Sequence, residues 1–498
     1  MLHRDYGVSA DEAAVRQFGI DAFDWLFRGG ALPTQQDWNF FNPIVTVIMR
    51  SIELGLGLTD GADIWFMRHL MTFCMFFVTV IAFYHIAWMR FRDWKLPLLG
   101  SLMFMVSPRI FAHGFYNPKD LPAMMLFAVS AWTMLLFLEK RTAVRFIIHI
   151  LCTALLISMR MFGLMMPVLA ILFLCMSPRV ARRGAASVSR DVLTLIPTQT
   201  LVLALIWPLL WNHPISGLIG AFFNTTSRSG GGFYFGHAFS SAGVPWHYLP
   251  IWIGITTPVI YSAFFLTGLV ALWIRCIHNP LGLLTEKQPA GLALLWFLLP
   301  VAALMVLPIG IFDEWRHVLF LYPAFLLITL EGVWWVTNLV KKIFSSHSYI
   351  HIWIYGILIM QMISTGAWMT LNHPFEYAYF SIPTRFIEDR FDLDYWGLGY
   401  RAGLEWIAKN DDRAHINVYT AARVGKTGAD TLPIEDWDRL YFTTPDKADY
   451  ILDNFRGHEY RQVFPEERKV HSIMVDGLEI LTVYTGPDTS RIFEPIAW

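Results

Sequence analysis

The sequence predicts a polytopic α-helical membrane protein that ends in a small α/β domain. Hydrophobic residues make up 55% of the chain and charged residues 15%, whereas roughly 25% is usual for the charged residues of soluble domains. Ten apolar segments lie between residues 65 and 371, and the composition becomes polar from about residue 372. The net charge of -1 shows no excess of basic residues of the kind that binds nucleic acid.

Three regions follow from this pattern: an acid-rich extracytoplasmic stretch (1–64), a transmembrane domain (65–371) and an extracytoplasmic α/β domain (372–498). A spanning helix needs roughly 20 apolar residues. Pro208, Pro258 and Pro300 fall inside predicted spans, where neighbouring helices can satisfy the freed carbonyls. The ten predicted spans are 65–89, 96–107, 122–138, 145–158, 162–176, 192–211, 249–274, 290–311, 318–340 and 349–371.

The orientation follows from the Lys and Arg residues of alternate loops. Thirteen lie in loops 90–95, 139–144, 177–191, 275–289 and 341–348, and five lie in the opposite loops. The positive-inside rule makes the first set cytoplasmic. Both termini, loops 107–121 and 212–248 and residues 313–317 are then expected outside. Exporting an acidic tail without a leading helix is unusual, so we expect an upstream helix to be missing. Alternatively, the tail crosses with the first span.

The N-terminal stretch predicts helices that lie along the bilayer surface. Ser9 and Glu12 have the spacing of a capping box. The helix that follows places Val15, Phe18, Ala22 and Leu26 on one face, and residues 44–58 form a second amphipathic segment.

The C-terminal region predicts a mixed fold. Leu404 and Ile407 indicate a short helix, and residues 415–420 and 450–452 indicate strands. Two alternating segments, 470–475 and 478–484, flank Asp476-Gly477, which is a strong signal for a two-residue hairpin.

Several polar residues beside the membrane are candidates for a site, although each has a structural explanation when taken alone. Asp11 and Glu12 suit any helix N-terminus, and Asp120 can cap the helix that begins near Pro122. Arg316 and His317 can snorkel to the interface. The short loop 107–121 carries Arg109, His113, Asn117, Lys119 and Asp120.

Taken together, these residues resemble the motifs of a known family. The run Asp5-Tyr6-Gly7-Val8-Ser9-Ala10-Asp11-Glu12 resembles the first-loop acidic motif of polytopic glycosyltransferases with the C-type fold. The closer similarity is to the bacterial branch related to dolichyl-phosphate-mannose protein mannosyltransferases and aminoarabinose transferases (glycosyltransferase family 39). Residues 107–122 are similar to the second-loop motif of that branch. Residues 249–258, 313–317 and 394–400 are similar to further stretches, so the resemblance covers nearly the whole chain.

The resemblance implies transfer of a hexose or pentose from a polyprenyl-phosphate donor to an acceptor hydroxyl at the extracytoplasmic face of a bacterial inner membrane. By motif position, Asp11 is the base, Glu12 orients it and Asp120 assists. Fixed cations must stabilise the leaving phosphate, and a single base without a covalent intermediate implies inversion. Asp11 and Asp120 could also hold a divalent cation. The residues expected to bind substrate are Arg109, His113, Asn117, Lys119, Arg316 and His317.

Two other functions remain open: a lipid or glycolipid transporter or flippase, and a non-catalytic lipid-binding relative. Transporters place charged groups near the bilayer midplane. Here Arg68, His69, His85, Arg160 and Glu331 lie mostly toward the ends of predicted spans. The sequence therefore favours an enzyme, whose acceptor is a protein, a lipid or a glycan.

Overall fold

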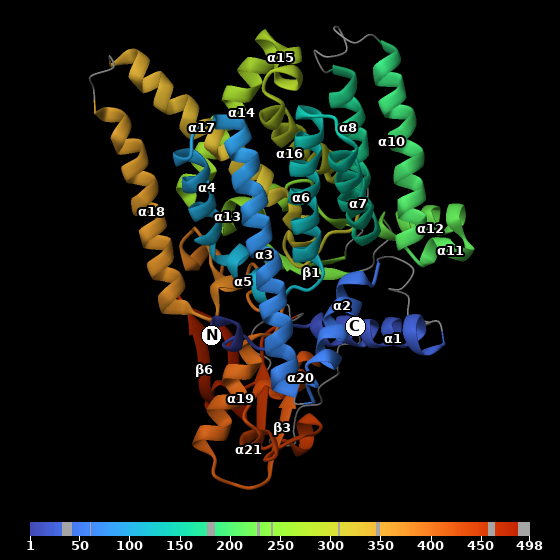
Figure 1. Cartoon of the computed structure of the whole chain (residues 1–498). Coiled ribbons are helices and arrows are strands. Elements are labelled where there is room, and N and C mark those ends of the chain that lie inside the picture. Colours follow the sequence, from blue (N-terminus) through green and yellow to red (C-terminus); the bar gives the residue numbers. More distant parts are fainter. Residues whose placement is uncertain are drawn as a thin grey trace.

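A computed structural model describes residues 1–31, 42–59, 61–176, 185–226, 230–240, 243–306, 309–344, 349–456 and 464–486. Long helices stand side by side in one part of the molecule, and a small sheet domain lies below their lower ends (Figure 1). Two N-terminal helices, α1 (Glu12–Arg28) and α2 (Ile44–Gly55), lie across the helix ends on the same side as the sheet.

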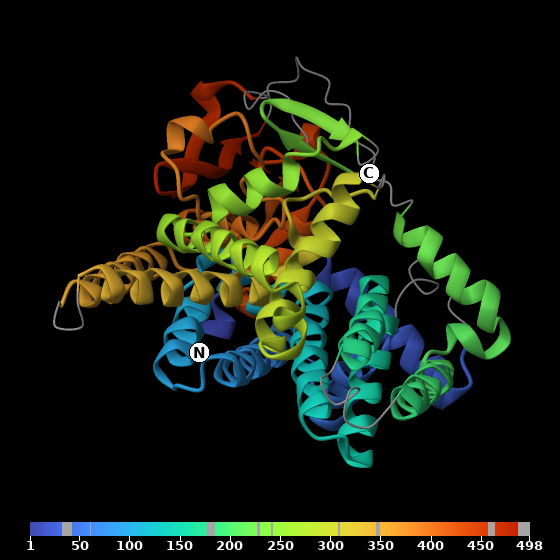
Figure 2. The same ribbon diagram turned by 90° about the horizontal axis from the view of Figure 1, so that it is seen from above.

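In the described part of the chain, seven helices are long and apolar enough to cross a membrane. The protein is therefore an integral membrane protein, as the sequence predicted. Seen from above, α17 and α18 extend together to one side of the bundle (Figure 2). The seven helices are α3 (Gly61–Phe91), α6 (Asp120–Glu139), α10 (Ala185–Ile206), α14 (Val259–His278), α16 (Gln288–Val306), α17 (Tyr322–Ile343, preceded by the 3-10 turn Arg316–Leu321) and α18 (Ile350–Asn372).

The prediction of ten spans exceeds this number because several apolar stretches are broken. Segment 96–107 is α4 (Lys95–Met105), which with α5 (Pro108–Tyr116) forms one pair bent by 66°. Segment 249–274 divides at Pro258 into α13 (Tyr248–Thr256) and α14. Segments 145–158 and 162–176 become the shorter helices α7 (Ala143–Met159) and α8 (Met165–Met176), which are separated by extended backbone at Arg160 and by the 3-10 turn Met161–Leu164. Pro300 lies inside α16, as predicted.

Helices α14 and α17 cross with their backbones almost in contact. A Cβ atom added to Gly268 would lie 1.9 Å from the carbonyl oxygen of Ile328, and one added to Gly332 would lie 2.0 Å from that of Phe264. Only glycine permits this approach, because any side chain would overlap the neighbouring backbone. The crossing fixes the position of α17, whose N-terminal end leads into the site described below.

The expectation of surface-lying N-terminal helices is wrong for the apolar face of α1. Val15, Phe18 and Ala22 are at most 2% exposed, and Phe18 and Ala22 pack with Val47 of α2 in a small hydrophobic cluster. The apolar face of α1 is therefore buried against protein and does not face lipid. Packing against protein removes apolar surface from water, as contact with lipid would.

The C-terminal sheet confirms the predicted elements and adds one strand. Its order is β4-β3-β5-β7-β6, with parallel pairing of β3 to β4 and β5 and antiparallel pairing elsewhere. Asp476 and Gly477 both have positive φ, 50° and 81°, as a type I′ hairpin turn requires. The elements are α19 (Gly399–Asn410), β3 (Ile416–Thr420), α20 (Val424–Gly428), α21 (Ile434–Trp437), β4 (Leu440–Phe442), β5 (Tyr450–Asp453), β6 (Lys469–Val475) and β7 (Leu478–Thr485).

Residues that precede α19 belong to the core of the helical part. Tyr377, Phe391 and Trp396 pack in the main hydrophobic cluster, whereas Tyr400 begins the separate core of the sheet. The long loop 212–248 also contains a hairpin that the sequence did not predict. Its elements and the remaining short helix are α11 (Leu209–Asn212), α12 (Pro214–Thr226), β1 (Gly231–Tyr234), β2 (His237–Ser240) and α15 (Pro280–Thr285).

Candidate active site

Local helix chemistry brings the predicted loop 107–121 to the end of the bundle. Ser107 has extended backbone at the N-cap of α5, and Pro108 takes the first helical position, where its missing N–H costs nothing. The side-chain oxygen of Asn117 then accepts the backbone N–H groups of Lys119 at 3.3 Å and Asp120 at 2.9 Å. Asn117 therefore caps α6 and fixes the direction of the two charged residues that follow it.

Asp11 is positioned by the contacts of Ser9 and Glu12. The carboxylate of Glu12 accepts the backbone N–H of Ser9 at 2.7 Å and lies 3.0 Å from Nε2 of His69. The Ser9 hydroxyl donates to the carbonyl oxygen of Tyr116 at 2.8 Å. Only half of the predicted capping box forms, because Ser9 uses its hydroxyl to join the N-terminal segment to α5.

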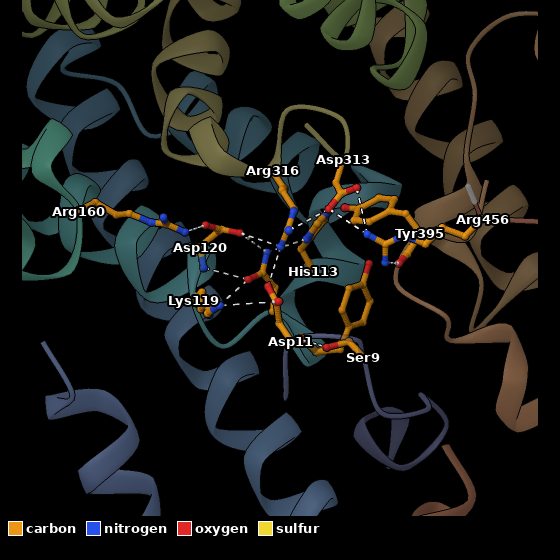
Figure 3. Close-up of polar contacts among 12 residues, drawn as sticks. Ser9, Asp11, His113, Lys119, Asp120, Arg160, Asp313, Arg316, Tyr395 and Arg456 are labelled. Carbon is orange, nitrogen blue, oxygen red and sulfur yellow. Dashed lines mark hydrogen bonds and ion pairs between the residues drawn. The ribbon is translucent and has the colours of Figure 1, made fainter. Parts of the chain in front are cut away.

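Arg316 lies among three aspartates and is the centre of the site (Figure 3). Its Nη1 donates to Oδ2 of Asp11 at 2.6 Å, and its Nη2 donates to Oδ2 of Asp313 at 2.9 Å. Nη1 is also 4.0 Å from Oδ2 of Asp120. One guanidinium therefore connects the N-terminal segment, the start of α6 and the turn before α17.

Three more cations surround these aspartates. Arg160, between α7 and α8, forms an ion pair with Asp120, and Nζ of Lys119 is 3.7 Å from Oδ1 of Asp11. Arg456, which follows β5, places Nη2 at 3.3 Å from both carboxylate oxygens of Asp313. We call these seven residues the Arg316 network: Asp11, Lys119, Asp120, Arg160, Asp313, Arg316 and Arg456. It carries one more positive charge than negative charges.

The electrostatics of the network keep Asp11 ionised. Burial alone would raise the pKa of its carboxyl group, but the charges of Lys119 and Arg316 outweigh burial and hold the pKa well below its usual range. The side chain is still 21% exposed, so it is the carboxylate of the network most open to an incoming molecule: those of Asp120 and Asp313 are each 2% exposed.

The backbone beside Arg316 is strained. Asp313 and Glu314 have φ angles of 51° and 65°, a left-handed conformation that costs non-glycine residues energy and that persists where surrounding contacts hold it. Glu314 forms a buried ion pair with Arg109, and burial raises the pKa of Glu314 to about 7. This arrangement turns Asp313 toward Arg316 and Arg456.

The other predicted residues lie beside the network, and one of them contacts it: the amide nitrogen of Asn117 donates to Oδ2 of Asp120 at 3.3 Å. Arg109 is bound by Glu314 and by the carbonyl oxygen of Tyr379 at 2.8 Å. Nδ1 of His113 lies 3.0 Å from the amide nitrogen of Asn117, beside the network (Figure 3). His317 packs its ring against Phe312 at 4.7 Å. Of the residues predicted from the sequence, Asp11, Lys119, Asp120 and Arg316 come together.

Sequence reasoning missed Arg160, Asp313 and Arg456 as site residues. Arg160 carried a signal, since it is a rare cation between two apolar segments on the side poor in positive charge. Two aromatic residues of the stretch 394–400 also reach the site: the guanidinium carbon of Arg316 is 4.8 Å from the ring centroid of Trp396 and 5.9 Å from that of Tyr395. Asp394, in the same stretch, accepts the backbone N–H groups of Leu398 and Gly399 and so holds the start of α19.

Neither a protein-family model nor a curated protein sequence matches this chain. Its structure does match solved ones. The oligosaccharyltransferase AglB of Archaeoglobus fulgidus, in complex with an inhibitory peptide and a dolichol-phosphate, superposes with a TM-score of 0.50 at 9% identity, over 91% of this chain and 66% of that one. The chain has the fold of a polytopic membrane glycosyltransferase.

Two further structures of the Archaeoglobus fulgidus oligosaccharyltransferase give the same result. The apo form has a TM-score of 0.50 at 10% identity and covers 89% of this chain and 62% of its own. The complex with Zn and sulfate has a TM-score of 0.50 at 10% identity, over 91% and 64%. This chain therefore spans just under two thirds of the length of the proteins it matches.

A metal site at Asp11 and Asp120 does not fit the arrangement of side chains. A divalent cation between two carboxylates needs their oxygens free as ligands. Here Nη1 of Arg316 stands next to both carboxylates, at 2.6 Å and 4.0 Å, and Arg160 holds the other oxygen of Asp120. The described residues contain no group of three or more His, Cys, Asp or Glu side chains suited to a metal ion. A metal at this point would have to displace an arginine.

Proposed function

We propose that this protein is a glycosyltransferase that moves a sugar from a polyprenyl-phosphate donor to an acceptor hydroxyl at the membrane face that carries the C-terminal domain. The observation that carries the proposal is the Arg316 network. It places a partly exposed, ionised carboxylate within 2.6 Å of a guanidinium at the end of a membrane bundle with a glycosyltransferase fold.

The cations supply what the leaving group needs. Cleavage of the sugar–phosphate bond leaves negative charge on a lipid phosphate, and fixed donors aimed at that charge lower the barrier. Arg316 can grip phosphate oxygens with two nitrogens, and Lys119 stands on the other side of Asp11. The excess positive charge of the network favours binding of an anionic donor.

Asp11 is our candidate for the base. A carboxylate whose pKa is held low is a weak proton acceptor, because adjacent cations stabilise its charge. A donor phosphate that binds Arg316 and Lys119 competes with Asp11 for these cations. The pKa of Asp11 then rises just as an acceptor hydroxyl arrives, so the proton passes from the hydroxyl to Asp11 while the oxygen attacks the anomeric carbon. Direct displacement of this kind inverts the anomeric configuration.

The remaining predicted residues take supporting roles in this proposal. Glu12 and Asn117 hold Asp11 and Asp120 in position through backbone hydrogen bonds. Asp120 assists by keeping Arg316 and Arg160 in place. Arg109 binds Glu314 and so supports the turn that presents Asp313.

The location of the site supports its assignment to the outer face of a bacterial inner membrane. The network and the C-terminal domain lie at one end of the bundle, and the last turns of α3, α14 and α17, which carry Arg90, Arg275 and Lys341, lie at the other (Figure 1). By the positive-inside rule the second end is cytoplasmic. Nucleotide sugars are not available outside the cell, so an enzyme at the outer face needs another sugar donor, and a lipid-linked sugar can serve as that donor.

A transporter or flippase is the alternative function. Its charged groups would be expected near the bilayer midplane, whereas the Arg316 network lies where the helices meet the N-terminal segment and the residues before α19. This position favours an enzyme over a translocation pathway.

The test is donor turnover by the purified protein in detergent or vesicles. Polyprenyl phosphates that carry different labelled hexoses and pentoses are offered with a crude acceptor extract, and release of free polyprenyl phosphate is measured. Wild-type protein should consume one donor, and Asp11→Asn should lower the rate by about 10²–10⁴-fold, the range for loss of a general base.

Asp5→Asn is the matched control, since Asp5 lies on the same segment and pairs with His373, outside the network. Equal turnover by wild type and Asp11→Asn would exclude Asp11 as the base. Vesicle scrambling of the lipid without turnover would favour the flippase.

A further inference from the structure

A second charged cluster lies at the end of the bundle opposite the Arg316 network. The carboxylate of Glu331, in α17, is 1% exposed and binds two arginines. Nη2 of Arg90, in the last turn of α3, donates to Oε2 at 2.8 Å, and Nη1 of Arg275, in the last turn of α14, donates to the same oxygen at 2.8 Å. Three helices are therefore joined at one buried carboxylate.

The same cluster gathers a third cation that this carboxylate does not neutralise. Nζ of Lys287, between α15 and α16, is 5.7 Å from the ring centroid of Trp334, and the guanidinium carbons of Arg90 and Arg275 are 5.3 Å and 4.8 Å from it. Three positive charges thus converge on one tryptophan and share one buried carboxylate. Burial lowers the pKa of Lys287, and repulsion from Arg275 and Arg90 lowers it further, while Glu331 and Glu286 oppose this with smaller effects.

A purely structural role explains two of these cations and leaves the third unexplained. At the opposite end of the bundle, Glu53 also gathers three cations, but Arg16, Arg50 and Arg68 all lie within 3.5 Å of its carboxylate. In the described residues Lys287 forms no such ion pair, and it stays partly exposed, as does Arg275 at 20%. Repulsion of Lys287 by the two arginines outweighs its attraction by Glu331 and Glu286 and costs stability, so an additional anion is favourable at this position.

We propose that Lys287 and Arg275, above Trp334, bind the phosphate of an anionic phospholipid from the leaflet at this end of the bundle. An ammonium and a guanidinium are strong hydrogen-bond donors to phosphate oxygens, and tryptophan is typical of the headgroup region. Basic pockets between helices on the cytoplasmic side recognise anionic headgroups, and the positive-inside rule places this end in the cytoplasm. The adjacent lipid-facing side chains suit acyl chains, because Trp273, Ile277 and Leu281 are 59–66% exposed.

This site does not depend on the proposed transferase activity, and its test measures lipid directly. Full-length protein is reconstituted in phosphatidylcholine bilayers that contain phosphatidylglycerol, re-extracted in mild detergent, and its retained lipid is counted by native mass spectrometry. Wild-type protein should retain phosphatidylglycerol in preference to phosphatidylcholine. Lys287→Ala should lower that retention about fivefold, the effect of one basic residue near an anionic lipid surface. Lys287 ties no helices together, so this variant keeps the Glu331 contacts.

The control is Lys341→Ala/Lys342→Ala, which removes two cations from the last turn of α17 at the same end of the bundle. It should leave retention unchanged. Thermal unfolding gives a second readout: phosphatidylglycerol should stabilise wild type more than Lys287→Ala, and soluble glycerol phosphate should stabilise neither. Equal retention by wild type and Lys287→Ala, or an equal loss in the control, would overturn the proposal. Stabilisation by glycerol phosphate alone would show a site for a soluble phosphate instead of a lipid.

Discussion

Replacing Arg316 by lysine tests whether the geometry of this cation matters beyond its charge. The guanidinium uses two different nitrogens, Nη1 for Asp11 at 2.6 Å and Nη2 for Asp313 at 2.9 Å. A lysine keeps the positive charge but has one nitrogen, which cannot occupy both positions. The variant Arg316→Lys therefore loses at least one charge-assisted hydrogen bond, which lowers the free energy of unfolding by roughly 1.5–3 kcal/mol.

The loss of activity should exceed what this destabilisation explains. If the guanidinium grips the leaving phosphate with two donors, removal of one costs about 10²–10³-fold in kcat, or about 2.7–4 kcal/mol of barrier. The assay is donor turnover at saturating donor, combined with thermal unfolding of the same preparation. We expect a folded protein whose kcat falls by at least about 100-fold.

Arg401→Lys is the matched control. Arg401 also fastens the N-terminal segment, through the carbonyl oxygens of Arg4 at 2.6 Å and Tyr6 at 3.0 Å, but it lies outside the network. It should lose a comparable amount of stability and keep kcat within about tenfold of wild type, a difference of about 1.4 kcal/mol. A kcat of Arg316→Lys that also stays within this limit would refute the reasoning.

Three other predictions follow from buried groups. Arg160→Gln leaves the carboxylate of Asp120 without its closest cation, so the free energy of unfolding should fall by roughly 3 kcal/mol. The double variant Arg160→Gln/Asp120→Asn should recover part of this loss, because it also removes the unpaired buried charge. No recovery would mean that the two side chains are not coupled. Burial raises the pKa of Asp394 to about 7, above the value of about 3.9 in an unfolded chain. The folded protein therefore binds this proton more tightly, stability should fall as pH rises from about 4 to 7, and Asp394→Asn should flatten that slope in thermal unfolding. Gly332→Ala places a Cβ 2.0 Å from the carbonyl oxygen of Phe264, so it should destabilise the fold by about 1–3 kcal/mol and lower donor turnover. Gly356→Ala in α18, where a Cβ meets open space, should do neither.

Local chemistry explains which parts of the fold were predictable from the sequence. The Asp476-Gly477 hairpin depends on two adjacent residues that adopt positive φ. Signals within a few residues were sufficient there. The bend at Pro108 and the break at Pro258 were not predicted as interruptions of spans, because a proline in a membrane helix is tolerated or not according to its neighbours.

The candidate site was predictable only in part, because its charges come from distant parts of the chain. Asp11, Lys119, Asp120 and Arg316 were found through a family resemblance. Arg456 was not, since it contacts Asp313 across 143 residues of sequence and lies in a region with no such motif. Glu12 and Asn117 have the right residue type for catalysis, but their hydrogen bonds show that they hold the backbone, and Asn117 also orients the carboxylate of Asp120. Residue type alone does not distinguish these two uses of a polar side chain.

The contact of Arg456 with Asp313 has a consequence for synthesis. The membrane helices, with Asp11, Asp120 and Arg316, leave the ribosome and enter the bilayer while the C-terminal sheet is still being made. Asp313 receives its second arginine only when β5 is in place and Arg456 follows it. An unfinished chain therefore has a network with equal numbers of positive and negative charges, and completion of the last domain adds Arg456 and with it the excess positive charge of the membrane-proximal site.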